Sequence, residues 1–275
     1  MEFDLAGIRR SPEFSPNHIN NDWTILKLTA EEFTRLGYSV QLLDEEEIGA
    51  APPQSPVIFN MCQGAAANHI LQEIENAGRL IINQPGGVLN CHRHNLVALL
   101  QQAQIPFPQS FIVDTGKTGS IPDAALVLDR LWIKRGDVHA TRPGDVVLVD
   151  ARREQIAPVL AGFHQRGIAQ AILQEHLEGP TIKFYAVQHD GFFRWYHLNG
   201  EPPARLDEQA LYHIAEAASE ALGLQIYGGD AIATPDGRLM IIDVNDWPSY
   251  ARFSETAAKY IARHIIKKAK EHGKL

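Results

Sequence analysis

The sequence predicts an N-terminal α/β domain followed by a larger α+β region with two lobes. Up to about residue 83, short apolar segments alternate with helical patterns, which is typical of a parallel sheet. Beyond residue 87, short strands come in clusters with helices between them, which is typical of antiparallel sheets. A chain of 275 residues is long enough for this arrangement. We expect domains at 1–86, 87–170 and 171–275.

In the first domain, residues at helical spacing predict helices and short apolar runs predict strands. The expected helices are 21–36 and 65–77, and after a first short strand the expected strands are 38–43, 56–60 and 80–83. Gln84-Pro85-Gly86-Gly87 interrupts the pattern, because Pro and Gly break both kinds of element. This segment is therefore the expected domain boundary.

The remaining elements are read in the same way. In the middle section we expect helices at 94–104 and 152–165 and strands at 110–113, 131–135 and 146–149. In the last section we expect strands at 171–177, 182–188 and 192–197, helices at 207–222 and 254–270, and a hairpin between these two helices.

Composition and charge exclude several classes of protein. The net charge of -8 and the lack of a dominant basic stripe argue against a nucleic-acid partner. Cys62 and Cys91 lack the paired spacing of a disulfide framework or a zinc ribbon. The N-terminus has no secretory signal, and no apolar run approaches the length of a membrane span. We expect a soluble, cytoplasmic protein without a membrane partner.

The hairpin around Thr234-Pro235-Asp236-Gly237-Arg238 is the most informative segment. A two-residue Asp-Gly turn places Asp230 opposite Asp243, and Asn245 then projects from the same face as Asp243. Two facing carboxylates destabilise a sheet, and a divalent cation would cancel their repulsion. Two carboxylates and an amide oxygen are ligands that magnesium takes. Two alternatives stay open: a type I turn with a bulge, which shifts the register by one residue, and an ordinary hairpin with solvated acids.

Two lysines lie in otherwise apolar strands. Lys134 ends the segment Leu131-Trp132-Ile133-Lys134, and a turn-like loop that contains His139 follows it. A fixed cation beside such a loop is suited to binding a polyphosphate, although a strand lysine can also protect a sheet edge from aggregation. Lys183 is a second cation in an apolar strand. Together with the acidic hairpin, the two lysines predict a nucleotide-metal site.

The order of these segments resembles the ATP-grasp superfamily, in particular its RimK and glutathione-synthetase-like branch. The resemblance covers residues from about 83 to 260, and its segments are Asn83-Gln84-Pro85, Ile105-Pro106-Phe107-Pro108, the strand lysine Lys134, Leu173-Gln174-Glu175-His176-Leu177 and Ile242-Asp243-Val244-Asn245-Asp246-Trp247-Pro248. It implies a two-lobed ATP-grasp fold after a pre-ATP-grasp-like domain. It also implies that Lys134 contacts ATP phosphates, that Gln174 to Leu177 bind adenine, and that Asp230, Asp243 and Asn245 hold magnesium. The nucleotide-binding set that we expect is Lys134, His139, Gln174, Glu175, His176, Leu177, Glu178 and Lys183.

The sequence departs from the branch at three places. His94 and Asn95 stand where an Asp-Lys pair is usual, so one phosphate-binding cation is missing or supplied elsewhere. Thr181 stands where many members carry an acid for the ribose, and Glu178 is the expected substitute. Asp243 replaces the more usual glutamate, and with Asn245 and Lys183 it is closer to the ATP-grasp inositol-phosphate kinases.

Residues for the other substrates are placed less specifically. Asn60-Met61-Cys62-Gln63-Gly64 follows a strand, and ligands of open α/β sheets bind beyond such strand ends. A polar loop after the first strand has Arg9, Arg10, Asn17 and Asn20, either as an anion site or as a solvated loop. Arg205 and Arg252 are candidate catalytic anion clamps, because arginine binds carboxylate and phosphate through two parallel hydrogen bonds. His92 and His94 lack a third zinc ligand, and no serine or cysteine lies in a recognisable nucleophile setting.

From these residues and the resemblance to the ATP-grasp superfamily, we expect the protein to be a carboxylate-amine ligase. Such an enzyme uses ATP and Mg2+ and forms an acyl phosphate. Its expected partners are a small-molecule or peptide carboxylate and an amine. A small-molecule kinase of the inositol-phosphate type and a non-catalytic ATP-binding protein are the alternatives. The sequence leaves the identity of both substrates open, and it does not decide whether the chain forms a homo-oligomer.

Overall fold

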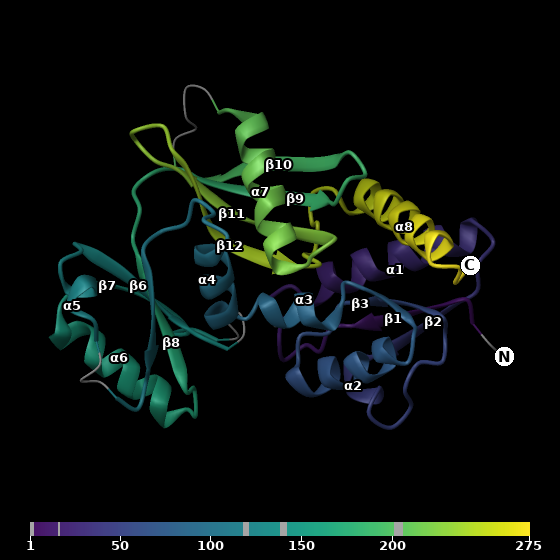
Figure 1. Ribbon diagram of the computed structural model, residues 1–275, viewed down its shortest axis with the longest axis horizontal. Coiled ribbons are helices and arrows are strands. Elements are labelled where there is room, and N and C mark those ends of the chain that lie inside the picture. Colours follow the sequence, from purple (N-terminus) through teal and green to yellow (C-terminus); the bar gives the residue numbers. More distant parts are fainter. Residues whose placement is uncertain (1–2, 16, 118–120, 138–141, 201–205) are drawn as a thin grey trace.

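The computed structural model describes residues 3–15, 17–117, 121–137, 142–200 and 206–275 (Figure 1). The first domain contains a four-stranded sheet in the order β2-β1-β3-β4, and every strand pair in it is parallel, as predicted. Its elements are β1 (Leu5–Arg9), α1 (Ile19–Arg35), β2 (Val40–Asp44), the short 3-10 turn η1 (Glu45–Glu47), β3 (Val57–Asn60), α2 (Ala65–Asn76) and β4 (Leu80–Ile82). Helix α1 covers one face of this sheet and α2 covers the other.

The expected break at Gln84–Gly87 is a short helix, α3 (Pro85–Asn90). Gln84 is the N-cap and Pro85 is the first helical residue, where proline is favoured because its missing N–H is not needed there. Gly87 lies against the end of another helix, and a Cβ on it would lie 2.6 Å from the carbonyl oxygen of Gly223. The two residue types that predicted a loop thus begin a helix and allow it to pack closely.

The second sheet has the order β5-β8-β6-β7 and is antiparallel, as predicted. Its elements are β5 (Ser110–Asp114), the short unpredicted helix α5 (Asp123–Leu126), β6 (Arg130–Arg135), β7 (Val146–Asp150), α6 (Arg153–Gln165) and β8 (Gln170–Glu175). Helices α5 and α6 close its apolar core. The domain limit at residue 170 stays a prediction, and β8, which begins at that residue, pairs with β5 and β6.

The third sheet carries the acidic hairpin and has the order β10-β9-β11-β12, again antiparallel. Helices α4 and α7 pack on one face of it, through the alternate residues Ile182, Phe184 and Ala186 of β9. Its elements are α4 (Arg93–Gln102), β9 (Thr181–Val187), β10 (Phe192–Asn199), α7 (Glu208–Leu222), β11 (Ile226–Ala233) and β12 (Leu239–Asp246). The opposite face therefore carries the residues between them, Lys183 and Tyr185.

The C-terminal helix α8 (Ser254–Glu271) returns to the first domain and lies beside α1 (Figure 1). One core includes residues of α1, α8, the first sheet and the β9–β10 end of the third sheet. Within the described part of the chain, no helix combines the length and the apolar character that a membrane span needs. The cytoplasmic location stays a prediction.

Two contacts hold the hairpin in place. Asn83 donates to the carbonyl oxygen of Ile226 at 2.7 Å, and its side-chain oxygen accepts from the N–H groups of Gln225 and Ile226 at 2.9 Å each. On the free edge of β12, the N–H of Ile241 donates to the carbonyl oxygen of Pro106 at 2.9 Å. The start of β11 and the edge of β12 are thus fixed by two of the segments that the sequence singled out.

Candidate active site

The hairpin places Asp230 directly opposite Asp243, as predicted, but not through a two-residue turn. The N–H of Gly237 donates to Thr234 at 2.8 Å and Gly237 has a φ of 85°, so the loop is a type I turn closed by a glycine bulge. This turn shifts the register by one residue. A second bulge between Asp230 and Ala231, with Ile242 as the extra residue on β12, shifts it back. The two-residue turn was therefore wrong, and two irregularities restore the carboxylate pair.

Lys183 is the next residue in the same row of the sheet. It is paired with Asp230 in the β9–β11 register, and its ammonium donates to both carboxylate oxygens at 3.1 and 3.0 Å. Burial raises the pKa of Asp230, the Lys183 ammonium lowers it, and the neighbouring Asp243 raises it further. The lysine thus offsets part of the repulsion between the two aspartates.

Lys134 approaches the same hairpin from the second sheet. Its ammonium donates to Oε1 of Gln174 at 2.6 Å and to the carbonyl oxygen of the bulged Ile242 at 3.5 Å. Burial lowers its pKa to about 8, against the attraction of Asp243 and with a further lowering by Arg93. Strand β6 lies between β8 and β7, so the alternative of an edge-protecting lysine was wrong.

Lys134 also lines a cavity of about 310 Å³ between the second and third sheets. One wall is the segment predicted to bind nucleotide, and the other includes Ile232 and Ile242 of the hairpin. The predicted residues that line it are Lys134, Gln174, Glu175, His176, Leu177 and Glu178. Two of these residues bond to the strand β6: His176 accepts at Nδ1 from Nε1 of Trp132 at 3.0 Å, and Glu178 forms an ion pair with Arg130.

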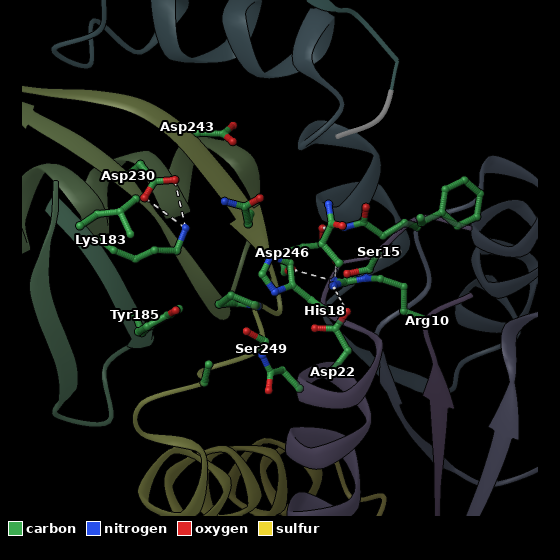
Figure 2. A pocket seen from close by; sticks show the side chains of 18 of the residues that line it. Arg10, Ser15, His18, Asp22, Lys183, Tyr185, Asp230, Asp243, Asp246 and Ser249 are labelled. Carbon is green, nitrogen blue, oxygen red and sulfur yellow. Dashed lines mark hydrogen bonds and ion pairs between the residues drawn. The ribbon is translucent and has the colours of Figure 1, made fainter. Parts of the chain in front are cut away.

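A second cavity, of about 480 Å³, lies on the same face of the third sheet, beyond the carboxylate pair, and reaches the first domain (Figure 2). Figure 2 shows the ion pair of Lys183 with Asp230, with Asp243 next to it on the neighbouring strand. The third sheet contributes the predicted residues Lys183, Asp230, Asp243 and Asn245, and the first domain contributes Arg10, Phe14, Ser15, Asn17, His18, Asn21, Asp22 and Gln63. The two cavities thus lie on either side of the carboxylate pair.

Only some of the substrate-site residues predicted in the first domain line the larger cavity. Arg10 is buried, donates to the carbonyl oxygens of Met61, Asp246 and Trp247 at 3.1 to 3.2 Å, and pairs with Asp22 at 3.1 Å. It therefore holds the end of β12 against the first domain. Arg9 points elsewhere, toward Asp44 at 3.5 Å. Of the other residues, Asn17 and Gln63 line the larger cavity and Asn20 does not.

The predicted anion clamps are not in the cavity walls that the structure describes. Arg252 does not line either cavity, but its guanidinium carbon lies 3.8 Å from the ring centroid of Tyr196, which does. Arg205 and His139 lie outside the described residues. His94 bonds through Nδ1 to the carbonyl oxygen of Gly136 at 2.6 Å, and the described residues hold no group of three or more His, Cys, Asp or Glu side chains suited to a metal.

Sequence reasoning missed Arg93, Tyr185 and Tyr196, which line the larger cavity. Arg93 is the first residue of α4 and is almost fully buried. Burial lowers its pKa, and the nearby Asp243 opposes that effect. The basic run His92-Arg93-His94 at a helix start was the available signal. The two tyrosines lie in strands where aromatic residues are common in any sheet.

No family model and no curated protein sequence matches this chain. Its structure is similar to that of the ATP-grasp ligase PsnB complexed with a minimal precursor, with a TM-score of 0.65 and 15% identity over 98% of this chain and 100% of that one. The chain has the ATP-grasp fold. D-alanine–D-alanine ligase from Bacillus anthracis complexed with ATP is similar with a TM-score of 0.71 and 13% identity, over 99% of this chain and 100% of that one. A RimK domain ATP-grasp protein from Sphaerobacter thermophilus is similar with a TM-score of 0.68 and 18% identity, over 94% of this chain and 98% of that one.

Proposed function

We propose that this protein is an ATP- and magnesium-dependent ligase that joins a carboxylate to an amine through an acyl phosphate. The observation that carries the proposal is the pair Asp230 and Asp243, with Lys134 and Lys183 beside it and a cavity on either side. The ATP-grasp fold supports it, and so do the similar structures, which include a complex with AMPPNP and a complex with ATP.

In this proposal the adenosine of ATP occupies the smaller cavity and its phosphates extend past Lys134 to the hairpin. The backbone and side chains from Gln174 to Leu177 bind the base, and Glu178 binds the ribose. Lys134 lines this cavity and its ammonium contacts the hairpin at Ile242, where it can also contact a phosphate. Burial disfavours its charge, and a bound anion would restore it.

Magnesium fits the residues that the hairpin offers. Asp230, Asp243 and Asn245 would hold it, since carboxylate and amide oxygens are hard ligands and the two carboxylates repel each other without a cation between them. When bound, the ion supplies positive charge beside the phosphates of ATP. The similar PsnB structure with Mg and ADP supports this assignment.

Arg93 is our candidate for the phosphate-binding cation that His94 and Asn95 do not provide. It lines the larger cavity at the start of α4, one residue before the position where related proteins carry aspartate and two before their lysine. Burial lowers the pKa of Arg93, and the nearby carboxylate of Asp243 favours its charge. A guanidinium there can bind phosphate oxygens through two parallel hydrogen bonds.

The chemistry follows from these positions. A carboxylate oxygen of the acid attacks the γ-phosphorus of ATP, the bond to ADP breaks, and an acyl phosphate forms. The amine nitrogen then attacks the acyl carbon, a proton leaves the nitrogen, and phosphate departs as the amide forms. Lys134, Arg93 and Lys183 orient the reacting oxygens and balance their charge, and they form no covalent bond.

The charge of the larger cavity favours a ligase over a kinase for a polyanion. Its cationic side chains are Arg10, Arg93 and Lys183, and its acidic side chains are Asp22, Asp230, Asp243 and Asp246. A kinase for a highly phosphorylated substrate needs a clear excess of cations, because the substrate phosphates repel those of ATP. The larger cavity has no such excess among the residues described.

The test follows the label of γ-labelled ATP in the presence of magnesium and pools of carboxylic acids, amines and polyols. A ligase releases the label as free phosphate only when an acid and an amine are both present. Label retained on an organic product would instead establish a kinase. ATP binding without turnover in any pool would establish a non-catalytic nucleotide-binding protein. Asp129→Asn, an exposed aspartate away from both cavities, is the control for changes at Asp243.

A further inference from the structure

Two tyrosines line the larger cavity beside the ion pair of the hairpin. Tyr196 of β10 is directly opposite Lys183 of β9, and Tyr185 follows Lys183 by two residues on the same face. Lys183 in turn is opposite Asp230. The row Tyr196, Lys183, Asp230 and Asp243 therefore crosses all four strands, from the phenol to the predicted metal ligands.

Among the described residues, one of the two hydroxyl protons of these tyrosines has no hydrogen-bond acceptor. They lie 3.4 Å apart, so one phenol donates to the other. Two phenols have two protons between them, and the mutual hydrogen bond uses one. The Lys183 ammonium has three N–H groups, and the two contacts to Asp230 use two of them. Counting the described residues alone, one phenolic proton and one ammonium proton thus remain for a ligand in the cavity.

Packing holds these donors in place before any ligand binds. Tyr185 is 2% exposed, and its ring centroid lies 5.1 Å from that of Tyr250. The guanidinium carbon of Arg252 lies 3.8 Å from the ring centroid of Tyr196. Gly228 lies between Tyr185 and Asn245 in the next row, and a Cβ there would lie 3.0 Å from Cδ1 of Tyr185. The absence of a side chain at Gly228 leaves room for the phenol.

We propose that Tyr185, Tyr196 and Lys183 form the subsite for the carboxylate of the acid substrate, an inference that rests on the proposed ligase function. Two donor protons match the two oxygens of one carboxylate, whereas a phosphate subsite needs more cations. The subsite lies one strand away from Asp230, so the carboxylate is beside the phosphate that it attacks. Once the amine has added, the same donors stabilise the negative oxygen of the tetrahedral intermediate.

Arg252 acts through Tyr196 in this arrangement. Its guanidinium stacks on the phenol ring and does not line the cavity, so in the proposed subsite it is a positioning residue. A cation over a tyrosine ring is favourable and fixes the orientation of the ring.

The test measures carboxylate binding to the 275-residue chain loaded with Mg2+ and AMPPNP. Ligand-detected saturation-transfer NMR is recorded with acetate, succinate, benzoate, glycine and glutamate as separate probes. The variants are the double substitution Tyr185→Phe with Tyr196→Phe and the control Tyr212→Phe, which removes a tyrosine hydroxyl on the outer helix α7. A single substitution is less informative, because the remaining phenol would have its own proton free to donate.

We expect at least one carboxylate to bind the wild type and the Tyr212→Phe variant, and to bind the double variant about tenfold more weakly or worse, since hydrogen bonds to charged groups are strong. AMPPNP affinity stays unchanged in all three proteins. Equal carboxylate binding by the double variant, or none by the AMPPNP-loaded wild type, overturns the subsite. Failure of the wild type to bind AMPPNP overturns the proposed function itself, and the subsite with it.

Discussion

Lys134 makes nucleotide affinity depend on pH in a range that can be stated in advance. Burial lowers its pKa to about 8 in the free protein, where Asp243 and Asp230 favour its charge and Arg93 opposes it. A bound triphosphate adds negative charge beside the ammonium and raises the pKa again. The complex therefore holds the proton over a range in which the free protein loses it, and ATP affinity falls as the pH rises through about 8.

The size of the effect follows from this one titration. At about pH 7 some nine-tenths of the free protein carries the Lys134 proton, and at about pH 9 only about one-tenth does. AMPPNP affinity is thus expected to fall about tenfold over this interval, or about 1.4 kcal/mol. At about pH 8, binding takes up about half a proton per nucleotide.

The assay is isothermal titration calorimetry with AMPPNP at fixed free Mg2+, in two buffers with different enthalpies of ionisation. The Lys134→Met variant is the control, because any pH dependence that it retains comes from the nucleotide or from other residues. We expect this variant to bind more weakly at neutral pH and to lack the fall above about pH 8. Equal pH dependence in both proteins would refute the assignment of Lys134 to the phosphates.

Three further substitutions test the site around the hairpin. Asp243→Ala is expected to abolish turnover, and circular dichroism is expected to show that the variant is folded. The control Asp129→Asn is expected to keep full activity. Near-normal activity of Asp243→Ala would contradict the metal assignment. Lys183→Met removes the ammonium partner of Asp230. We expect the variant to bind Mn2+ about tenfold more tightly in the absence of nucleotide, as measured by electron paramagnetic resonance. Unchanged or weaker Mn2+ binding would contradict competition between the lysine and the metal for Asp230. Arg93→Met is expected to weaken AMPPNP binding about tenfold, and the midpoint of thermal unfolding checks that the variant is folded. Unchanged AMPPNP affinity would contradict the assignment of Arg93 to the phosphate site.

Local patterns in the sequence were sufficient for most of the fold. The parallel sheet of the first domain and the antiparallel clusters after it follow from segment length and alternation, and each expected strand of the described chain lies within about two residues of its prediction. One exception is Gln84–Gly87, where proline and glycine were interpreted as a break. In the structure they begin α3, because the meaning of both residues depends on what packs against them.

The candidate site was predicted in part. Two lysines in otherwise apolar strands and the acidic hairpin predicted a site that contains Lys134, Lys183 and Asp243. These local patterns could not show how the strands are ordered. The order β10-β9-β11-β12 places Lys183 against Asp230, 47 residues away, and no local pattern contains that information. The bulge at Ile242 was also not predictable, since it depends on what the free edge of β12 meets in the other lobe. The proposed substrate role of Tyr185 was missed for the same reason.

The most direct measurement of the central claim follows oxygen from the acid into phosphate. The protein is incubated with ATP, Mg2+, an amine and a carboxylic acid whose carboxylate carries heavy oxygen, and the released phosphate is analysed by mass spectrometry. An acyl phosphate transfers one carboxylate oxygen to phosphate, so we expect one heavy oxygen in each phosphate that is released with amide. Amide formation with unlabelled phosphate, or phosphate release that does not depend on the acid, would contradict the proposed mechanism.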